Sequence, residues 1–539
     1  MDRPWHRSGR LRYALGRLRG FANPPVTVTE PPDDIVTERD AEVRTRDGTV
    51  LRVNVFHAPD DQRHPVVVCA HPYGKDNLPS RRGNRSSFSP QYRLLRQPDA
   101  ITFSTLTGWE APDPVWWVAQ GFAVVNADLR GAGHSEGTAK LLSQQESEDV
   151  RDIIAWAADQ PFSDGRVVML GVSYLAISQY GAAALQPAAL RAICPWEGFT
   201  DVYRELVFPG GVAEKGFVRI WSLLLRRTAR VAYAMTDMQQ AHPTRDDFWR
   251  SLVPDLSAIK VPMLVCGSFS DNNLHSRGSM RAFSHTGSTH ARLYTHRGGK
   301  WATFYSEAAR AEQLAFFRHV LSGQQGTRSV RLEVREDRET IAAVREETDW
   351  PLPRTSWRRL YLAQPGVLSA EAPARGGSIS FKTRSRAASF TWQVHEDVEL
   401  TGPMTARLWL DLYGCDDANL FVGVEKWRDG SYVPFEGSYG YGRDRVTTGW
   451  QRVALRASLT DPKPVSAGEI VSVDVELGPS ATLFRAGEQL RLVVAGRWLA
   501  PRNPLTGTFP AAYAASPRGR ITLYWGPNHD AHLLVPEIG

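Results

Sequence analysis

The chain has 539 residues, of which 42% are hydrophobic and 23% are charged. Such a length exceeds one ordinary hydrophobic core, and the composition excludes a disordered or fibrous chain. The 64 basic and 58 acidic residues leave a formal net charge of +6, a balance too even to indicate a nucleic-acid partner. No apolar run approaches the roughly 20 residues that a membrane span needs.

The first 35 residues form a basic N-terminal extension with six arginines before residue 21. This extension lacks the uninterrupted apolar core of a secretory signal, so we interpret it as a solvated segment, with a short basic amphipathic helix as the alternative. Four cysteines show no metal-ligand spacing, which indicates reduced thiols and favours a cytoplasmic protein: Cys69, Cys194, Cys266 and Cys415.

Residues 36–200 alternate between strand and helix patterns. A hairpin around Asp47-Gly48 precedes a continuous apolar strand at 65–70, which is typical of a buried parallel sheet. After an irregular insertion at 75–114, a second core strand covers 121–128. A helix follows at 147–159, with its apolar residues on one face.

Helical runs without a strand pattern fill residues 201–255, which we interpret as a cap inserted in the fold. Strands at 261–267 and 291–294, followed by a helix, complete the part that spans 256–350. Strands that alternate with amphipathic helices predict an α/β fold with a doubly wound, mostly parallel sheet.

Helical periodicity ends near Trp350-Pro351. Beyond this boundary, residues alternate between apolar and polar, as at 407–412 and 471–477. This pattern predicts that residues 351–539 form an all-β sandwich of the jelly-roll kind.

Ser173 stands where an apolar strand, 167–172, turns into a helix-compatible stretch, 177–185. Such a turn lifts a serine hydroxyl clear of the sheet and is typical of the nucleophile of α/β-hydrolases. The generic pattern G-x-S-x-G requires glycine at 175, where this chain has Leu175. The alternative is an ordinary turn at a buried strand end.

A serine nucleophile requires a histidine base and an acid that orients it, and each should follow a later strand. Asp271 lies four residues beyond Gly267, and His296 follows the strand at 291–294. We therefore predict Asp271 and His296 as these partners, against the alternatives of a helix-capping aspartate and an exposed loop histidine. The backbone N–H of Tyr174 is the expected first donor to the oxyanion.

Several motifs in order resemble one family: Gly-Val-Ser-Tyr-Leu at 171–175, Pro72-Tyr73, Asp-Leu-Arg-Gly at 128–131, and Gly267 with Asp271 and His296. Together they resemble the family of X-prolyl dipeptidyl-peptidases, cocaine esterase and α-amino-acid ester hydrolases. The resemblance implies an α/β-hydrolase domain with a helical cap and a C-terminal jelly roll. It also implies that the hydroxyl of Tyr73 joins the N–H of Tyr174 in the oxyanion hole.

The chain departs from the family pattern at Ala176, where the family has glycine, and in the 75–114 insertion, so the substrate does not carry over. Trp196 and Trp301 are candidates for an aromatic pocket, with core packing as the alternative. Glu197 is a candidate carboxylate near the pocket, together with Asp201 and Glu205, although surface ion pairs explain these residues equally well.

These observations predict a cofactor-free serine hydrolase, without a metal, that cleaves a small-molecule ester through an acyl-enzyme intermediate. Amide or peptide hydrolysis in the same site is the first alternative. Acyl or peptidyl transfer, or cyclisation, in a biosynthetic pathway is the second. A carbohydrate-binding or adhesion protein with a vestigial hydrolase fold is a non-enzymatic alternative. A homodimer is possible for a chain of this size.

Overall fold

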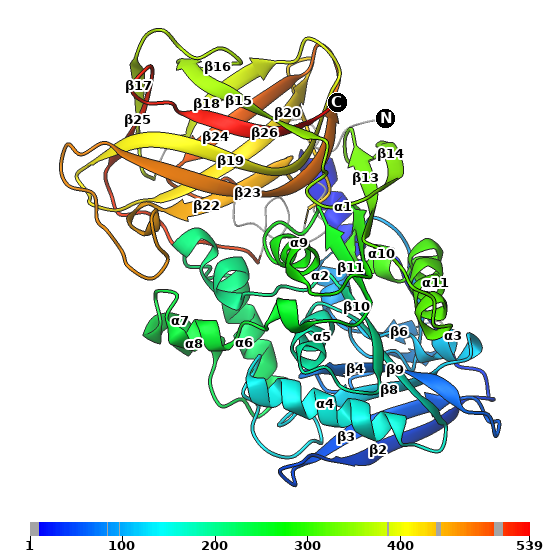
Figure 1. Cartoon of the computed structure of the whole chain (residues 1–539). Coiled ribbons are helices and arrows are strands. Elements are labelled where there is room, and N and C mark those ends of the chain that lie inside the picture. The colour runs from blue at the N-terminus through cyan, green and yellow to red at the C-terminus, as the bar shows by residue number, and fades with distance from the viewer. Residues whose placement is uncertain (1–9, 84, 96, 385–386, 438–442, 501–509) are drawn as a thin grey trace.

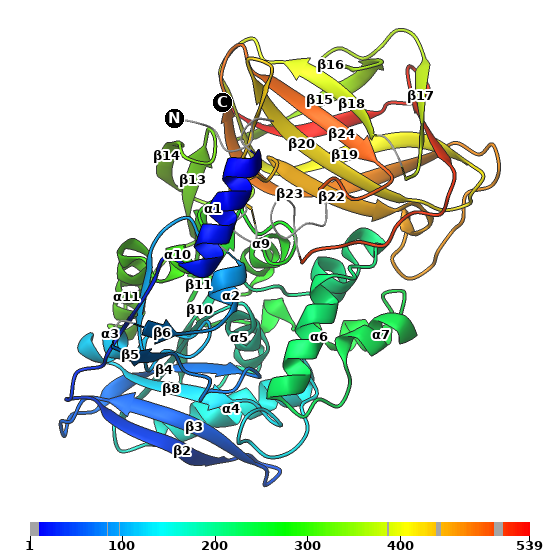
Figure 2. The ribbon, with the colours of Figure 1, turned by 180° about the vertical axis from the view of Figure 1, so that it is seen from behind.

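The computed structural model describes residues 10–83, 85–95, 97–384, 387–437, 443–500 and 510–539. An α/β part comes first in the chain, and an all-β part follows from residue 355 onward and packs against one end of it (Figure 1). Figure 2 shows the same two parts from behind, with helix α1 (Arg10–Ala22) facing the viewer.

The α/β part is built on one mixed sheet. Its seven central strands, from β8 to β13, are parallel, and antiparallel strands extend both edges. In spatial order the strands are β2 (Val36–Arg44), β3 (Val50–His57), β8 (Ala123–Asp128), β4 (His64–His71), β9 (Ser163–Val172), β10 (Leu190–Trp196), β11 (Met263–Ser268), β12 (Ala291–His296), β13 (Ser329–Arg335) and β14 (Ile341–Glu347). The core strands predicted from their apolar runs are therefore all present, and the hairpin at Asp47-Gly48 is the β2–β3 turn.

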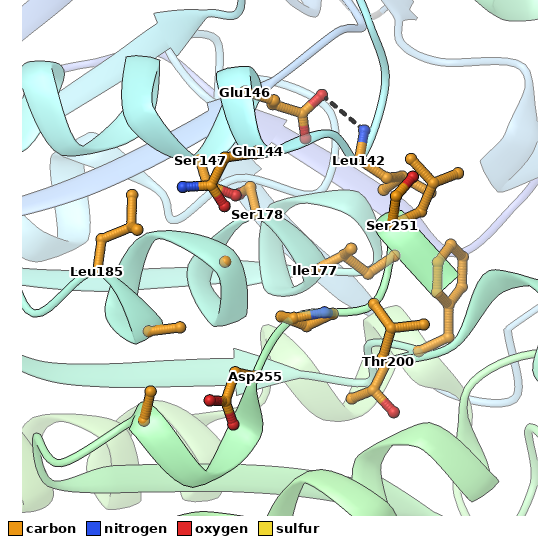
Figure 3. Close-up of a pocket in the computed structure, with 17 residues that line it drawn as sticks. Leu142, Gln144, Glu146, Ser147, Ile177, Ser178, Leu185, Thr200, Ser251 and Asp255 are labelled. Carbon is orange, nitrogen blue, oxygen red and sulfur yellow. Dashed lines mark hydrogen bonds between the residues drawn. The ribbon is translucent and has the colours of Figure 1, made fainter. Parts of the chain in front are cut away.

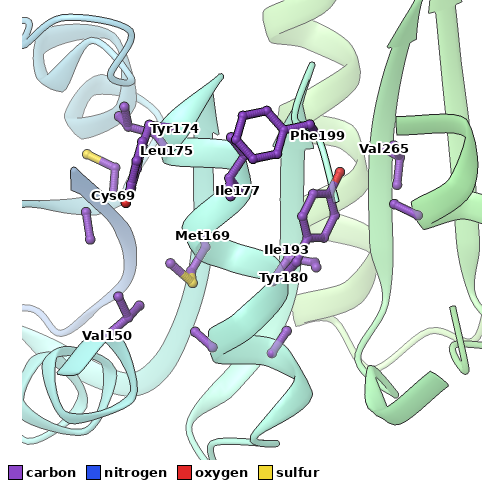
Figure 4. Close-up of a cluster of buried hydrophobic side chains, with 14 of the residues drawn as sticks. Cys69, Val150, Met169, Tyr174, Leu175, Ile177, Tyr180, Ile193, Phe199 and Val265 are labelled. Atoms are coloured by element: carbon purple, nitrogen blue, oxygen red, sulfur yellow. The ribbon is translucent and has the colours of Figure 1, made fainter. Parts of the chain in front are cut away.

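Successive side chains of each buried strand point to opposite faces of the sheet, so each strand contributes to two separate hydrophobic cores. Val66 and Val68 of β4 join one hydrophobic cluster, whereas Val67 joins the other. Figure 4 shows part of the first cluster, in which Met169 and Ile193 of the sheet lie beneath the helix that follows Ser173. The first cluster is covered by α4 (Gln144–Ala158), α5 (Tyr174–Ala184) and α9 (Ser276–His285), and the second by α3 (Pro114–Ala119), α10 (Lys300–Phe304) and α11 (Glu307–Leu321).

The N-terminal extension is more ordered than a solvated segment. Its helix α1 corresponds to the alternative drawn from the sequence, and β1 (Val26–Thr29) pairs in parallel with β7 (Ile101–Ser104) of the insertion. Val28 is buried in this contact. The insertion also contains β5 (Ser80–Arg82), β6 (Arg85–Ser87) and α2 (Gln91–Leu94). A short strand with one apolar anchor is too weak a periodic signal to be read in advance.

Helices and short helical turns connect β10 to β11, and all residues of this segment are described. Apart from isolated bridges at Glu214, Ala229 and Val231, it contains no strand. Its elements are a π-helical turn (Tyr203–Val207), two 3₁₀ turns (Pro209–Gly211 and Leu256–Ala258), α6 (Phe217–Thr228), α7 (Met235–Ala241) and α8 (Asp247–Ser251).

The C-terminal part consists of antiparallel strands around a hydrophobic cluster of its own. The two stretches predicted from alternation lie on paired strands, with Leu408 opposite Val473. The strands are β15 (Thr355–Gln364), β16 (Val367–Ser369), β17 (Gly377–Lys382), β18 (Ala387–Gln393), β19 (Val398–Tyr413), β20 (Asn419–Arg428), β21 (Ser431–Val433), β22 (Thr447–Arg452), β23 (Val471–Phe484), β24 (Gln489–Ala495), β25 (Arg520–Trp525) and β26 (His532–Ile538).

The two parts meet beside the loop that follows β11. Arg277, in the first turn of α9, donates hydrogen bonds to the carbonyl oxygens of Thr448 and Glu476, at 2.8 and 3.3 Å. Its guanidinium also lies 4.6 Å from the ring centre of Trp450. The all-β part therefore supports the start of α9 directly.

Among the described residues, no helix combines the length and apolar character needed to cross a membrane. All four cysteines are free thiols. Cys69, Cys194 and Cys266 are buried in sheet strands, and Cys415 is half-buried.

Candidate active site

Ser173 occupies a sharp turn between β9 and α5. Its backbone has φ 60° and ψ −116°, a conformation that non-glycine residues rarely adopt and that is typical of functional sites. The preceding Gly171 passes so close to Leu175 that a Cβ at 171 would lie 2.3 Å from the Leu175 Cβ. The local sequence therefore permits the turn, because glycine stands where a side chain would collide.

The side chain of Ser173 faces an imidazole. The Ser173 Oγ lies 3.2 Å from Nε2 of His275, and Nδ1 of His275 lies 2.6 Å from Oδ2 of Asp271. His275 and Asp271 are both 1% exposed. A hydroxyl, an imidazole and a carboxylate thus form one hydrogen-bonded row, the arrangement that activates a serine nucleophile.

Asp271 and His275, the two partners in the row with Ser173, both lie on a single turn of chain after β11. The backbone N–H groups of Leu274, His275 and Ser276 all donate to the carbonyl oxygen of Asp271, so residues 271 and 275 lie on the same side of one helical turn. The ring of Phe199 stacks in parallel on the imidazole of His275, with ring centres 6.1 Å apart. This packing fixes the plane of the imidazole.

His296, the base predicted from the sequence, does not contact Ser173 in the structure. Its Nε2 lies 3.1 Å from Oε1 of Glu197, and its Nδ1 accepts the backbone N–H of Gly298 at 3.1 Å. A backbone N–H can only donate, so Nε2 carries the hydrogen and donates it to Glu197. Both ring nitrogens of His296 are therefore occupied away from the serine, whereas the predicted Ser173 and Asp271 do meet around His275.

A buried group of charges surrounds Asp271 and His275. The Lys300 ammonium lies 2.8 Å from Oδ2 of Asp271 and 2.9 Å from Nδ1 of His275. Burial alone would raise the pKa of Asp271, but the positive charge of Lys300 and the bond with His275 hold that pKa below its usual range. The pKa of His275 is lowered by burial and by Lys300. Asp271 is therefore ionised and His275 neutral around neutral pH.

Glu110 lies in the same charged neighbourhood. Burial raises the pKa of Glu110 to about 7, against the lowering effects of Lys300 and of the hydrogen bond from the indole of Trp301, which is 2.9 Å long. The backbone of Glu110 also touches the nucleophile turn, because its carbonyl oxygen accepts the N–H of Val172 at 3.1 Å. A carboxyl group that titrates near neutrality thus lies beside the row of Ser173, His275 and Asp271.

The rings of the two tyrosines predicted to form the oxyanion hole lie next to each other. The rings of Tyr73 and Tyr174 meet edge to face with centres 6.0 Å apart. The hydroxyl of Tyr174 donates to Glu146 at 2.8 Å, so its side chain is engaged elsewhere, and Tyr174 offers its backbone N–H as the first residue of α5. The hydroxyl oxygen of Tyr73 accepts the indole N–H of Trp221 at 3.3 Å and keeps its own hydrogen to donate.

The predicted pocket residues are largely enclosed. Trp196 is fully buried in the second hydrophobic cluster, against Tyr294 and Phe304, which corresponds to the alternative of core packing. Trp301 is 3% exposed and orients Glu110, while the carboxylate of Glu197 accepts from His296.

The other two candidate carboxylates have structural partners. Asp201 forms an ion pair with Arg245 at 2.9 Å, and Glu205 forms one with Arg281 at 2.7 Å. Both carboxylates are therefore neutralised by arginines outside the row of Ser173, His275 and Asp271.

A cavity of about 330 Å³ borders this site on one side of α5 (Figure 3). It adjoins this hydrogen-bonded row through Phe199, which stacks on His275, and through Ile177, whose N–H donates to the carbonyl of Ser173. Its wall is mixed in polarity and includes Glu146, Ser178 and Thr200. Burial raises the pKa of Glu146 to about 8, so this wall presents a neutral carboxyl group around neutral pH.

Three groups of side chains among the described residues could supply metal ligands. One consists of Glu197, Cys266 and His296, and the other two contain two carboxylates and a histidine each. Near the nucleophile these are Glu197, Asp271 and His275, but the ammonium of Lys300 already contacts two of them. On the surface they are Asp40, Asp76 and His134, where the ammonium of Lys75 contacts both aspartates. We assign a metal to neither group.

Sequence reasoning missed His275, Lys300, Glu110 and Trp221. His275 had a usable signal, because an aspartate and a histidine four residues apart share one side of a helical turn. Lys300 and Glu110 carried none, since they reach the site from a short helix and from the irregular insertion. Trp221 comes from α6 and is recognisable only once that helix lies against Tyr73.

Comparisons with known proteins give consistent matches along the chain. Residues 47–300 match the X-Pro dipeptidyl-peptidase (S15 family), and residues 322–534 match the X-Pro dipeptidyl-peptidase C-terminal non-catalytic domain. A solved CocE/NonD family hydrolase from Staphylococcus aureus is 32% identical and superposes with a TM-score of 0.85, covering 96% of this chain and 99% of that one.

Curated relatives extend this likeness. Cocaine esterase of Rhodococcus sp. is 24% identical over 92% of this chain and 97% of its own length. A putative Xaa-Pro dipeptidyl-peptidase of Bacillus anthracis is 20% identical over 70% of this chain and 69% of its own length.

Proposed function

Since this chain belongs to the CocE/NonD family of hydrolases and matches both X-Pro dipeptidyl-peptidase domains, we propose that it hydrolyses a small-molecule ester through an acyl-enzyme intermediate. The observation that carries this proposal is the row of Ser173, His275 and Asp271, with contacts of 3.2 and 2.6 Å. Members of this family include esterases and dipeptidyl-peptidases.

The roles follow from the donors and acceptors in that row. Ser173 attacks the ester carbonyl while Nε2 of His275 takes the hydroxyl proton. Asp271 holds Nδ1–H and stabilises the imidazolium that forms. His275 then gives the proton to the departing alkoxide, and a water molecule repeats the same steps to release the acid and regenerate Ser173. We thus assign the base to His275 in place of His296.

We assign the oxyanion hole to the backbone N–H of Tyr174 and the hydroxyl of Tyr73. Donors held in advance at the developing charge stabilise the transition state by about 3–4 kcal/mol each. The bond from Trp221 to the Tyr73 oxygen supports this assignment, because it polarises the hydroxyl and fixes its direction.

We propose in addition that the helical segment 201–255 is a cap over the site and that residues 351–539 form a jelly roll that braces it. Trp221 of α6 reaches Tyr73, which supports the first assignment. The bonds from Arg277 to the carbonyl oxygens of Thr448 and Glu476 support the second, because they anchor the helix that begins beside His275.

Kinetics on a substrate panel test the reaction class. We expect p-nitrophenyl esters of short and medium acyl chains to be turned over with a higher kcat/KM than X-Pro anilides. The reverse order would replace ester hydrolysis by dipeptidyl-peptidase activity. Product analysis with and without an added amine distinguishes hydrolysis from acyl transfer, because a transferase would form the amide in preference to the acid.

A further inference from the structure

Lys300 is a basic residue that contacts two members of the row formed by Ser173, His275 and Asp271. It is the first residue of α10, its side chain is 9% exposed, and its ammonium lies 2.8 Å from Oδ2 of Asp271. The same ammonium lies 2.9 Å from Nδ1 of His275. Neither the nucleophile, nor the base, nor the oxyanion donors account for a buried positive charge at this position.

Two donors share one oxygen of Asp271. Both His275 and Lys300 point at Oδ2, whereas the buried Oδ1 has no hydrogen-bond partner among the described residues. With Asp271 as the common acceptor, Nδ1 of His275 carries its hydrogen and leaves Nε2 free to accept from Ser173. If Lys300 donated to Nδ1 instead, the hydrogen would sit on Nε2 and the imidazole could not act as a base.

The position of Lys300 also affects the charged form of His275. A second proton on the imidazole would place two positive charges 2.9 Å apart at Nδ1, which disfavours the imidazolium. The negative charges that offset this repulsion come from two different elements. Asp271 lies on the turn after β11, and a carboxylate oxygen of Glu197 lies within 4.8 Å of a His275 ring nitrogen.

The other faces of His275 add no further charge. Phe199 stacks on one side of the ring and the neutral hydroxyl of Ser173 meets Nε2. Glu110 approaches the cluster through its interaction with Lys300. Lys300 is therefore the positive group that faces this imidazole among the described residues.

We propose, on the basis of the function proposed above, that Lys300 is a positioning residue of the triad: it keeps Asp271 as the ionised partner of Nδ1–H and sets the low-pH limit of activity by disfavouring the His275 imidazolium. Lys300 touches neither the substrate nor the reacting atoms in this scheme. It acts on the reaction through His275 and Asp271.

The test measures the rate of labelling by a fluorophosphonate as a function of pH, because this probe reports activation of the serine without requiring the natural substrate. In the wild type the rate should rise as His275 loses its proton. In Lys300→Met the midpoint of this rise should move to higher pH by about one unit, the shift expected for one charge at this distance even with the dielectric constant of water. At a pH below both midpoints, the labelling rate of Lys300→Met, expressed as a fraction of its own plateau, should be about tenfold lower than that of the wild type.

Three further variants separate this role from a structural one. Lys300→Gln removes the charge but still donates to Asp271, so it should show the same shift even if Lys300→Met folds poorly. Lys300→Arg keeps the charge and should restore the wild-type midpoint. Lys426→Met is the matched control, because Lys426 is likewise a lysine enclosed in an ion pair, with Glu488 at 2.7 Å in the all-β part. Its midpoint should not move.

The outcomes distinguish the two proposals. A wild type that is labelled at Ser173, with midpoints unchanged in Lys300→Met and Lys300→Gln, overturns the role of Lys300 and leaves the triad intact. A wild type that is not labelled at Ser173 at any pH contradicts the proposed function itself.

Discussion

The backbone N–H of Ser173 donates to the carbonyl oxygen of Glu197 at 3.2 Å, and both residues have a positive φ, 60° and 52°. Glu110, whose carbonyl accepts the N–H of Val172, has a φ of 61°. Each such conformation costs about 1–3 kcal/mol and persists only where its surroundings enforce it. The central strands thus hold the nucleophile in a strained position through hydrogen bonds from a neighbouring strand end.

Replacing Ser173 separates this strain from catalysis. We expect Ser173→Ala to abolish ester hydrolysis with little change in melting temperature. Ser173→Gly should be equally inactive but more stable than Ser173→Ala by about 1 kcal/mol, because glycine adopts this backbone conformation without strain. Activity assays and denaturant unfolding measure the two effects. Near-wild-type turnover in Ser173→Ala would show that another residue is the nucleophile.

The same substitution at His275 and at His296 tests which of the two histidines is the base. His275→Gln should lower kcat by a factor of about 10⁴ or more, because the base is lost. His296→Gln should keep most of kcat and most of its stability, because the nitrogens of His296 contact groups other than Ser173 and the glutamine amide can still donate to Glu197. Steady-state kinetics and unfolding curves for both variants check these expectations. A large loss of kcat in His296→Gln alone would restore the sequence-based assignment.

The choice between these histidines shows why the site was only partly predictable. Ser173 and Asp271 follow apolar strands, and their positions relative to those strands are visible in the sequence. His296 ends β12 and fits the usual order equally well, but the backbone N–H of Gly298 and the carboxylate of Glu197 occupy its nitrogens. Such local hydrogen bonds depend on loop conformations that strand periodicity does not encode.

Tyr73→Phe tests the oxyanion hole. Removal of its hydroxyl should lower kcat by a factor of about 10²–10³ while changing KM little, because the donor acts on the charge of the transition state. Tyr203→Phe is the control, since that hydroxyl donates to the carbonyl of Pro243 in the helical segment, at 3.3 Å. Equal losses in the two variants would argue against a specific role for Tyr73.

Glu146 should make stability depend on pH. Its carboxyl group loses its proton near pH 4.5 when unfolded but at about pH 8 in the folded chain, so stability should fall as the pH rises between these values. Glu146→Gln removes this titration, and its melting temperature should fall less than that of the wild type between pH 5 and pH 8. Glu148→Gln, at a partly exposed site on the same helix, is the control. Parallel curves for wild type and Glu146→Gln would contradict the raised pKa.

The fold was predictable to the extent that burial repeats along the chain. Strands such as β4 and β9 are continuous apolar runs because both of their faces are covered, and β19 and β23 alternate because one face lies on a core. The insertion lacked such a signal. Its strand β7 has only four residues and pairs with β1, whose residues stand 75 positions earlier in the chain. Glu110, next to the nucleophile, lies on this unpredicted segment.

The most direct test of the triad is fluorophosphonate labelling followed by peptide mapping in the wild type, His275→Gln and His296→Gln. We expect the label on Ser173 in the wild type and in His296→Gln, and its loss in His275→Gln. Label on another residue, or loss of label in His296→Gln with retention in His275→Gln, would contradict the assignment of Ser173, His275 and Asp271 as the catalytic row.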